Sequence, residues 1–403
     1  MLSEPINLAE GKKESLCLYP FFNSMVTASG HYKPCCKFAG NLAHNGQVLQ
    51  APLDSFEDAF NSSDTIALRH QLLKGEKPEG CKVCWDEERQ GISSMRFDSF
   101  NYGIEATALA KMKTPARLDI YGSNICNLRC RICSPHYSSK WIQEAKETQG
   151  ITEQIHLNLT EKNFALVKEW LPGIIEIGLF GGEPLYMKET IAVLEYCVNQ
   201  KLSENITLLI NTNGTIYSDK IMTLFKSFKK VILNFSIDDI GARFEYQRKN
   251  ADWKEVVENM RSYLKNGGGV AQSDKIECKI CATVSMFNIY YLPELLLWLN
   301  AEFAGIQTYL NMLHGPYQLS VRNLPQFVKL AIEQKLSLYE NEMSKGGSAT
   351  IRTLQDVISF LNLPPNLAFE HCLKEIERGD SYRNEKFEAI YPEISALFSN
   401  VKV

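Results

Sequence analysis

Short apolar runs alternate with longer amphipathic stretches through the middle of the sequence. Six of these runs have the length and apolar content of buried strands, and each ends at a polar or glycine-containing turn. The predicted strands are residues 117–121, 174–180, 206–211, 231–236, 278–284 and 306–311. Apolar positions at helical spacing predict helices between them at residues 189–201, 217–228, 251–265 and 292–303. This alternation predicts an α/β fold of parallel βα units, in which the chemistry lies at the carboxyl ends of the strands.

The regions on either side of these units have a different character. The N-terminal region carries several cysteines before the first predicted strand, and the C-terminal region has helical spacing without a cysteine motif. We therefore expect a small N-terminal domain (1–112), a barrel of six βα units (113–318) and a helical C-terminal extension (319–403).

Composition and charge narrow the class of protein. Of the 403 residues, 45% are hydrophobic and 22% are charged, which excludes a disordered chain. The 43 Lys and Arg residues against 47 Asp and Glu, with no long basic run, argue against a nucleic-acid partner. The sequence contains no run of 18 apolar residues, so no membrane span is predicted. Residues 1–5 lack the charge pattern of a signal peptide. We therefore expect a cytoplasmic protein without a membrane partner, in which cysteines stay reduced and the closely spaced ones serve as metal ligands or catalytic groups.

The densest cysteine group follows the first predicted strand. Cys126, Cys130 and Cys133 lie within eight residues, in the sequence Cys-Asn-Leu-Arg-Cys-Arg-Ile-Cys. A structural zinc site requires four ligands, and His136 would complete one only through a strained turn. Three thiolates can instead hold an iron–sulfur cubane and leave one iron open. A zinc knuckle or three buried thiols are the alternatives.

The C-x3-C-x2-C spacing resembles the signature of the radical S-adenosylmethionine (radical SAM) enzymes. A second motif, Gly181-Gly182-Glu183-Pro184, follows the predicted strand 174–180. In the family, this motif binds the methionine amino group of the cofactor. The resemblance implies a partial (βα)6 radical SAM barrel that holds a 4Fe–4S cluster and S-adenosyl-L-methionine. One departure is Ile132, where the family usually has an aromatic residue near the adenine.

The same resemblance implies further cofactor-binding residues. Ser236 and Asp238 match a small polar pattern after the fourth strand, which contacts the ribose or the methionine carboxylate. Arg248 matches a position where an arginine meets that carboxylate, and a guanidinium suits a carboxylate because it can bind it through two hydrogen bonds. Asn213 is a further candidate. A solvated loop residue is the alternative for each.

Four more cysteines precede the barrel and resemble the ligand set of an auxiliary cluster. They are Cys17, Cys35, Cys81 and Cys84. Gly30, five positions before Cys35, predicts a hairpin turn. The spacing resembles the twitch module, the shortened form of the SPASM module, which holds an auxiliary 4Fe–4S cluster but follows the barrel in better-known enzymes. Neighbouring side chains on a strand point in opposite directions, so only one of Cys35 and Cys36 should reach the cluster, and the spacing from Gly30 favours Cys35. A zinc ribbon of the same four thiolates is the alternative.

The resemblance implies a reaction but no substrate. Electrons from a reductase such as flavodoxin or ferredoxin would cleave the cofactor, and the resulting 5′-deoxyadenosyl radical would remove a hydrogen atom from the substrate. An auxiliary cluster with four protein ligands favours an electron relay, which suits oxidation of a small molecule such as a sugar or alcohol. The alternatives are a peptide or protein maturase and a non-enzymatic metal-binding scaffold. His314 and Tyr246 lie at or past strand ends and are candidates for substrate contact or for a structural role.

Overall fold

A computed structural model gives the fold of the chain. It describes residues 15–51, 53–102, 109, 112–151, 167–267, 269–270, 274–343 and 354–399. Residues 1–14, which include the N-terminal segment considered above for a signal peptide, lie outside the described residues. In the part of the chain that is described, no helix is both long and apolar enough to cross a membrane.

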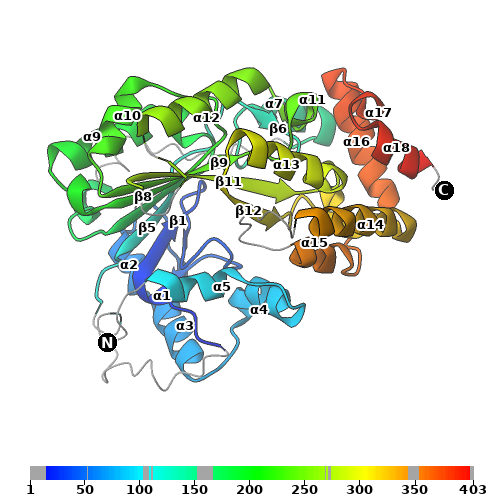
Figure 1. The fold of residues 1–403 in the computed structure, drawn as a ribbon. Coiled ribbons are helices and arrows are strands. Elements are labelled where there is room, and N and C mark those ends of the chain that lie inside the picture. The colour runs from blue at the N-terminus through cyan, green and yellow to red at the C-terminus, as the bar shows by residue number, and fades with distance from the viewer. Residues whose placement is uncertain are drawn as a thin grey trace. The chain divides into compact units, whose positions relative to one another are not determined.

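The main sheet has eight strands and is mostly parallel, in the order β12-β11-β9-β8-β7-β5-β1-β2 (Figure 1). The ladders β1–β5, β5–β7, β7–β8, β9–β11 and β11–β12 are parallel, whereas β1 and β2 pair antiparallel. The strands are β1 (Asn23–Val26), β2 (Tyr32–Lys33), β5 (Arg117–Tyr121), β7 (Glu176–Phe180), β8 (Thr207–Thr212), β9 (Lys230–Ser236), β11 (Ile276–Val284) and β12 (Gln307–Met312). Two short antiparallel pairs lie outside it: β3 (Ala43–His44) with β4 (Gln47–Val48), and β6 (Arg129–Cys130) with β10 (Arg248–Lys249).

All six strands predicted from the sequence are present, with ends that differ by at most two residues. The predicted helices correspond to α9 (Lys188–Asn199), α10 (Asp219–Lys226), α12 (Trp253–Gly267) and α13 (Leu292–Glu302). The sequence analysis did not foresee β1 and β2, which come from the cysteine-bearing N-terminal region. These strands have four and two residues, so they are too short for a periodic pattern to identify them.

The chain forms two compact units. The first comprises Met1–Asn124, Ile155–Ile210 and Ser227–Lys230, and the second comprises Ile125–Gln154, Asn211–Lys226 and Val231–Val403. The division of the sequence into residues 1–112, 113–318 and 319–403 stays a prediction.

The N-terminal part of the first unit, blue to cyan in Figure 1, combines the hairpin of β1 and β2 with short helices, of which the first two along the chain contact the hairpin. The helices are α1 (Tyr19–Phe22), α2 (Phe56–Phe60), α3 (Ser63–Leu73), α4 (Lys82–Arg89) and α5 (Met95–Asp98). Gly30 lies in the hairpin turn with a φ of 80°, a left-handed conformation that glycine adopts without strain. The predicted hairpin is therefore confirmed. An apolar cluster that includes Phe21, Leu72 and Trp85 forms the core of this region.

The second unit adds helices before and after its strands. They are α7 (Trp141–Gln149), α11 (Gly241–Gln247), α14 (Gln326–Met343), α15 (Leu354–Leu361), α16 (Phe369–Arg383), α17 (Phe387–Ile390) and α18 (Pro392–Ser399). The C-terminal helices are orange to red in Figure 1. Phe387, Tyr391 and Phe398 pack together where α16 gives way to α17 and α18. Helix α16 ends at Asn384, whose φ of 52° reverses the chain direction.

Candidate functional site

The cysteine loop of the second unit is held by backbone pairing on both sides of Cys130. Strand β6 contains Cys130 and pairs with β10, so that Cys130 lies directly opposite Arg248. The guanidinium Nη1 of Arg248 lies 3.8 Å from Cys130 Sγ. Cys126 Sγ accepts from the Leu128 N–H at 3.4 Å and from the Asn213 side-chain amide at 3.9 Å. Two of the three sulfurs therefore have hydrogen-bond donors aimed at them.

The three thiols of this loop lie close enough to influence one another. Burial raises the pKa of Cys133, and the neighbouring Cys130 and Cys126 raise it further. Burial also raises the pKa of Cys130, whereas the Arg248 guanidinium lowers it. Charge-assisted donors favour the thiolate, which is the form that binds iron. The donor set fits a cubane with three protein ligands and one open iron.

Among the residues that the structure describes, no three His, Cys, Asp or Glu side chains converge tightly enough to hold a single metal ion. The ligands of a cubane each bind a different iron, so their sulfurs need not meet at one point.

The predicted cofactor residues of the second unit occupy neighbouring positions, with two of them paired. Arg248 donates from Nε and Nη2 to Asp238 Oδ2 at 3.0 and 2.7 Å, and both side chains are buried. Asp238 Oδ1 accepts from the Thr283 N–H at 2.8 Å. Ser236 is the half-buried last residue of β9, opposite Cys281 on β11. The sequence analysis assigned Asp238 and Arg248 separate contacts with a cofactor and missed their mutual ion pair.

Asn213 lies directly after β8 and connects that strand end to the cysteine loop. Its amide donates to Asn127 Oδ1 at 2.9 Å, and its own Oδ1 accepts from the Thr215 N–H at 3.0 Å. Because the same amide also reaches Cys126 Sγ, Asn213 contacts the loop at two points. A role in positioning the loop is therefore visible for this residue, whereas direct cofactor binding stays a prediction.

The Gly181-Gly182-Glu183-Pro184 motif lies in the first unit, directly after β7. Gly181 and Gly182 have φ values of 80° and 50°. A Cβ on Gly181 would lie 2.9 Å from the Ser123 carbonyl oxygen, so this turn requires glycine for conformation and for space. Glu183 is buried, and its side chain accepts from the Leu185 N–H at 3.1 Å. Cofactor binding by the motif stays a prediction.

The four N-terminal thiols gather in the first unit from distant positions in the sequence. Burial raises the pKa of Cys17 and of Cys81 to about 12, and that of Cys84 to about 11. The neighbouring Cys84 raises the pKa of both Cys17 and Cys81 further. After burial, the causes that raise the pKa of Cys35 are Cys36, Cys17, Cys84 and Cys81. The four predicted ligands are therefore neighbours.

Cys36 has different surroundings from Cys35. Cys36 is exposed, its Sγ lies 3.4 Å from the sulfur of Met95, and Asp119 is among the groups that raise its pKa. Cys35 is close enough to Cys17, Cys81 and Cys84 for each of them to raise its pKa, and its role as a ligand stays a prediction.

Both candidates for substrate contact, Tyr246 and His314, contact other side chains of the protein. Tyr246 is buried, with its hydroxyl donating to Asp380 at 2.7 Å. The ring of His314 packs edge-on against Phe360 at 5.3 Å. Sequence reasoning missed Arg131, whose guanidinium lies 3.6 Å from the centroid of the Tyr246 ring. The sequence feature that could have indicated Arg131 is the presence of an arginine on each side of Cys130.

Comparison with known proteins identifies the class. Residues 120–276 match the Radical SAM superfamily. The matched residues include the cysteine loop and the Gly181-Gly182-Glu183-Pro184 turn, so this part of the chain is a radical SAM domain.

Curated relatives include GTP 3′,8-cyclases. The protein of Syntrophomonas wolfei is 28% identical over 142 residues, which cover 33% of this chain and 37% of the relative. The protein of Campylobacter curvus is 24% identical over 242 residues, which cover 60% and 70% of the two chains. The matches to the relatives from Syntrophomonas and Mycobacterium thus span little more than a third of each relative's length.

Solved structures resemble the chain at lower identity than these relatives do. Native anSMEcpe with bound AdoMet and Cp18Cys peptide is 17% identical, with a TM-score of 0.40 and coverage of 58% of this chain and 62% of that one. Streptococcus suis SuiB bound to precursor peptide SuiA is 13% identical, with a TM-score of 0.40 and coverage of 75% and 65%.

Proposed function

We propose that the chain cleaves S-adenosyl-L-methionine reductively at a 4Fe–4S cluster held by Cys126, Cys130 and Cys133. The observation that carries this proposal is the convergence of these thiols with the side chains of Asn213 and Arg248. When bound, the cluster and the cofactor supply a 5′-deoxyadenosyl radical that removes a hydrogen atom from the substrate. The protein orients the sulfurs, supplies donors that favour the thiolates, and excludes water from the loop.

In this proposal, Ser236, Asp238 and Arg248 of the second unit bind the cofactor. Cofactor binding by Gly181 to Pro184 of the first unit is proposed from the sequence motif alone. The Arg248–Asp238 pair is buried, so a carboxylate from the cofactor would meet a guanidinium already fixed in orientation by Asp238. A fixed guanidinium loses little conformational freedom when the ligand binds.

Cys17, Cys35, Cys81 and Cys84 are proposed to hold an auxiliary 4Fe–4S cluster, in a twitch-like module that precedes the barrel. The support is the proximity of the four thiols and the orientation of Cys36 toward other groups. Four protein ligands leave no open iron, so an electron-relay role follows for this cluster. A reductase such as flavodoxin or ferredoxin would supply the electrons.

Two classes of substrate are considered for this reaction, namely peptides or proteins and small molecules. Two of the similar structures contain peptides, namely the Cp18Cys peptide with anSMEcpe and the precursor peptide SuiA with SuiB. We therefore place peptide or protein maturation ahead of the small-molecule oxidation expected from the sequence. The similarity to those structures concerns the fold alone. Placing peptides ahead of small molecules therefore decides only which substrates are tested first.

The deciding experiment uses the full chain after anaerobic reconstitution with iron and sulfide. We expect about eight irons per chain, and release of 5′-deoxyadenosine from S-adenosyl-L-methionine when dithionite is added. The Cys126→Ala variant should release none, and the Cys197→Ala variant, which changes a buried helical thiol outside both groups, should behave as wild type. Folded wild-type protein without iron would leave the scaffold alternative standing. Deuterium transfer into 5′-deoxyadenosine from labelled peptides or from labelled sugars and alcohols would then distinguish the two substrate classes.

A further inference from the structure

The residue after Cys130 connects the cysteine loop to the segment around Tyr246. The backbone N–H of Arg131 donates to the Gln247 carbonyl at 2.7 Å, and its Nε donates to the Tyr246 carbonyl at 3.2 Å. Its guanidinium carbon lies over the Tyr246 ring, 3.6 Å from the centroid. The Arg131 side chain is only 4% exposed, so these contacts fix it in one orientation.

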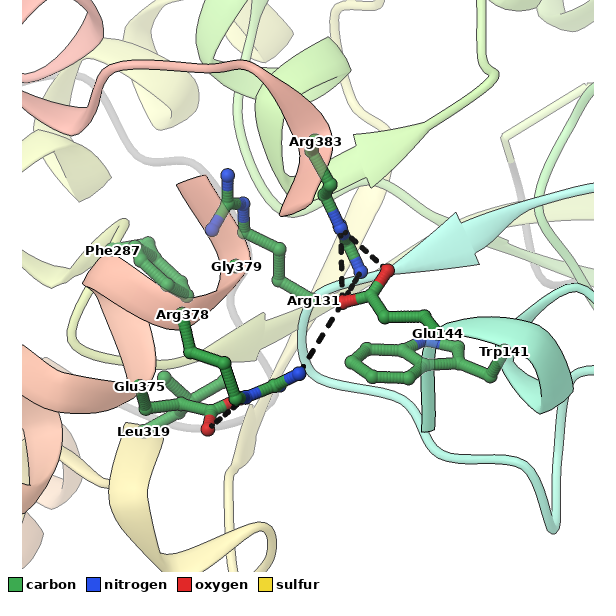
Figure 2. Close-up of a pocket in the computed structure, with 9 residues that line it drawn as sticks. All are labelled: Arg131, Trp141, Glu144, Phe287, Leu319, Glu375, Arg378, Gly379 and Arg383. Atoms are coloured by element: carbon green, nitrogen blue, oxygen red, sulfur yellow. Dashed lines mark hydrogen bonds and ion pairs between the residues drawn. The ribbon is translucent and has the colours of Figure 1, made fainter. Parts of the chain in front are cut away.

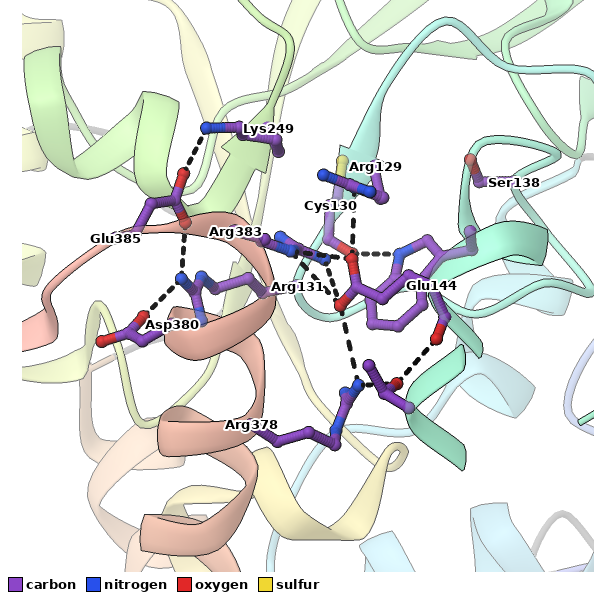
Figure 3. Close-up of polar contacts among 12 residues, drawn as sticks. Arg129, Cys130, Arg131, Ser138, Glu144, Lys249, Arg378, Asp380, Arg383 and Glu385 are labelled. Atoms are coloured by element: carbon purple, nitrogen blue, oxygen red, sulfur yellow. Dashed lines mark hydrogen bonds and ion pairs between the residues drawn. The ribbon is translucent and has the colours of Figure 1, made fainter. Parts of the chain in front are cut away.

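Two carboxylates from the C-terminal extension complete the surroundings of Arg131. Its Nη2 donates to Asp380 Oδ1 and to Glu385 Oε2, each at 2.6 Å (Figure 3). Glu385 also accepts from Lys249 at 2.7 Å, and Lys249 lies opposite Arg129 in the β6–β10 pair. The other oxygen of Asp380 accepts from the Phe387 N–H at 2.6 Å. Arg131 is therefore bound at the point where helix α16 ends and α17 begins.

Helix α16 also supports the cysteine loop through Glu144 of α7. Glu144 is fully buried and accepts from Arg383 at 3.0 and 3.2 Å, and Arg129 lies 3.2 Å from the same carboxylate. Beside it, the Trp141 indole N–H donates to the Cys130 carbonyl at 2.7 Å. Figure 2 shows Arg383 and Arg378 of α16 converging on Glu144 next to Trp141. A buried carboxylate needs such partners, and removal of one is costly.

A glycine in α16 provides an independent indication that the helix fits against Arg131. Gly379 lies inside α16, where glycine is less favourable than alanine by about 1 kcal/mol. A Cβ at this position would lie 2.6 Å from Arg131 Nη1. The guanidinium cannot move away easily, because Asp380, Glu385 and the Tyr246 ring hold it. The absence of a side chain at Gly379 therefore leaves room for Arg131.

We propose that helix α16 positions the middle ligand of the radical cluster, with Arg131 as the positioning residue between Cys130 and the C-terminal extension. This inference rests on the proposed function, because it assumes that Cys130 binds that cluster. It assigns the extension a part in the cluster site. Arg131 touches neither substrate nor cofactor in this assignment; it holds the backbone from which the Cys130 thiolate projects.

The sharpest test is Gly379→Ala, which alters α16 without changing any charge or any residue of the loop. The matched control is Ser381→Ala, an exposed position of the same helix where alanine also favours the helix. Full-length protein is reconstituted, and the electron paramagnetic resonance signal that changes on addition of S-adenosyl-L-methionine is recorded. Only a cluster with an open iron gives such a change, so an auxiliary cluster does not contribute. Hydrogen exchange of residues 126–133 is measured on the same samples.

We expect Gly379→Ala to reduce the cofactor-dependent change of the signal at least fivefold and to speed hydrogen exchange of residues 126–133 about tenfold. Ser381→Ala should match wild type in both measurements. Arg131→Met should reproduce the loss, and Arg131→Lys should recover part of it, because lysine keeps the charge but lacks the planar fork. The Lys variant also keeps the test informative if the Met variant does not fold.

Two results would overturn the proposal in distinguishable ways. If wild type shows the cofactor-dependent signal and both Gly379→Ala and Arg131→Met retain it in full, the positioning role is wrong and the proposed function stands. If iron-loaded wild type shows no response to S-adenosyl-L-methionine, the proposed function fails and the inference fails with it.

Discussion

The two groups of thiols differ in how their cysteines are distributed along the chain and in the charged side chains that act on them. The second unit draws three cysteines from one loop of eight residues, and charged side chains act on Cys130. Burial and Asp238 raise the pKa of Cys130, whereas Arg248 and Arg383 lower it. The first unit collects four cysteines from positions as far apart as 17 and 84 and offers weaker cationic support, with Arg96 last among the causes acting on Cys17. The loop thus places a guanidinium beside one of its sulfurs, whereas cations are lesser causes at the N-terminal thiols.

The difference has a consequence for electron transfer. Net charge and hydrogen bonds to the sulfurs set the potential of an iron–sulfur cluster, because a reduced cluster carries one more negative charge. A guanidinium next to Cys130 would therefore favour reduction of a cluster bound there, as the proposed cofactor cleavage requires. In the first unit, Lys37 lowers the pKa of Cys84 and Arg96 lowers that of Cys17, but each acts after several larger causes.

The largest expected effect comes from removing one ligand of each group. Cys130→Ala should lose about four irons and all release of 5′-deoxyadenosine. Cys84→Ala should also lose about four irons, but it should retain the cofactor-dependent signal and lose product formation, because only the electron relay is missing. Iron analysis and 5′-deoxyadenosine release measure both. Loss of cofactor cleavage in Cys84→Ala, with the other cluster intact, would show that the two sites are not functionally separate.

The next largest effect is expected at the cation beside Cys130. Arg248→Met leaves Asp238 buried without its partner, and breaking such a pair costs about 3–5 kcal/mol in the free energy of unfolding. In protein that stays folded, we expect the ratio of reduced to oxidised cluster at a fixed potential to fall about tenfold, which corresponds to about 59 mV for one electron. Denaturant unfolding and a redox titration measure the two effects.

The control for that variant is Arg96→Met in the first unit. Arg96 is a buried arginine paired with Glu88 at 2.7 Å and lies near Cys17, so its loss should also destabilise the protein. The signal that responds to S-adenosyl-L-methionine should keep its potential. If the reduction potential shifts equally in both variants, general destabilisation explains the shift. The proposed electrostatic difference between the two groups of thiols would then be wrong.

The smallest effect is expected from Cys36→Ala. Because Cys36 lies against the Met95 sulfur and is influenced by Asp119, we expect iron content to stay within error of wild type. Cys35→Ala should lose about four irons, since Cys35 faces the other three thiols. The opposite pattern in iron analysis would transfer the ligand role to Cys36.

The strands and helices of the βα units could be predicted because each has its own periodic pattern. β5 covers residues 117–121 as expected, and the ends of the other predicted strands differ by at most two residues. The candidate ligands were equally accessible, since Cys126, Cys130 and Cys133 lie in one short motif. Strand β1 was missed because four residues cannot show a period, and its place beside β5 depends on pairing between segments about 90 residues apart.

The sequence by itself determined which residues belong to the repeating units and which thiols are grouped by spacing, because both are local properties of the chain. The tertiary structure alone decided that Arg248 pairs with Asp238, that Cys35 and Cys36 face different groups, and that Arg131 reaches residues some 250 positions later. These contacts join segments that are distant in the sequence, and no local sequence pattern identifies them as partners. Burial makes them selective, since a charge removed from water is stable only where the fold brings its partner into contact.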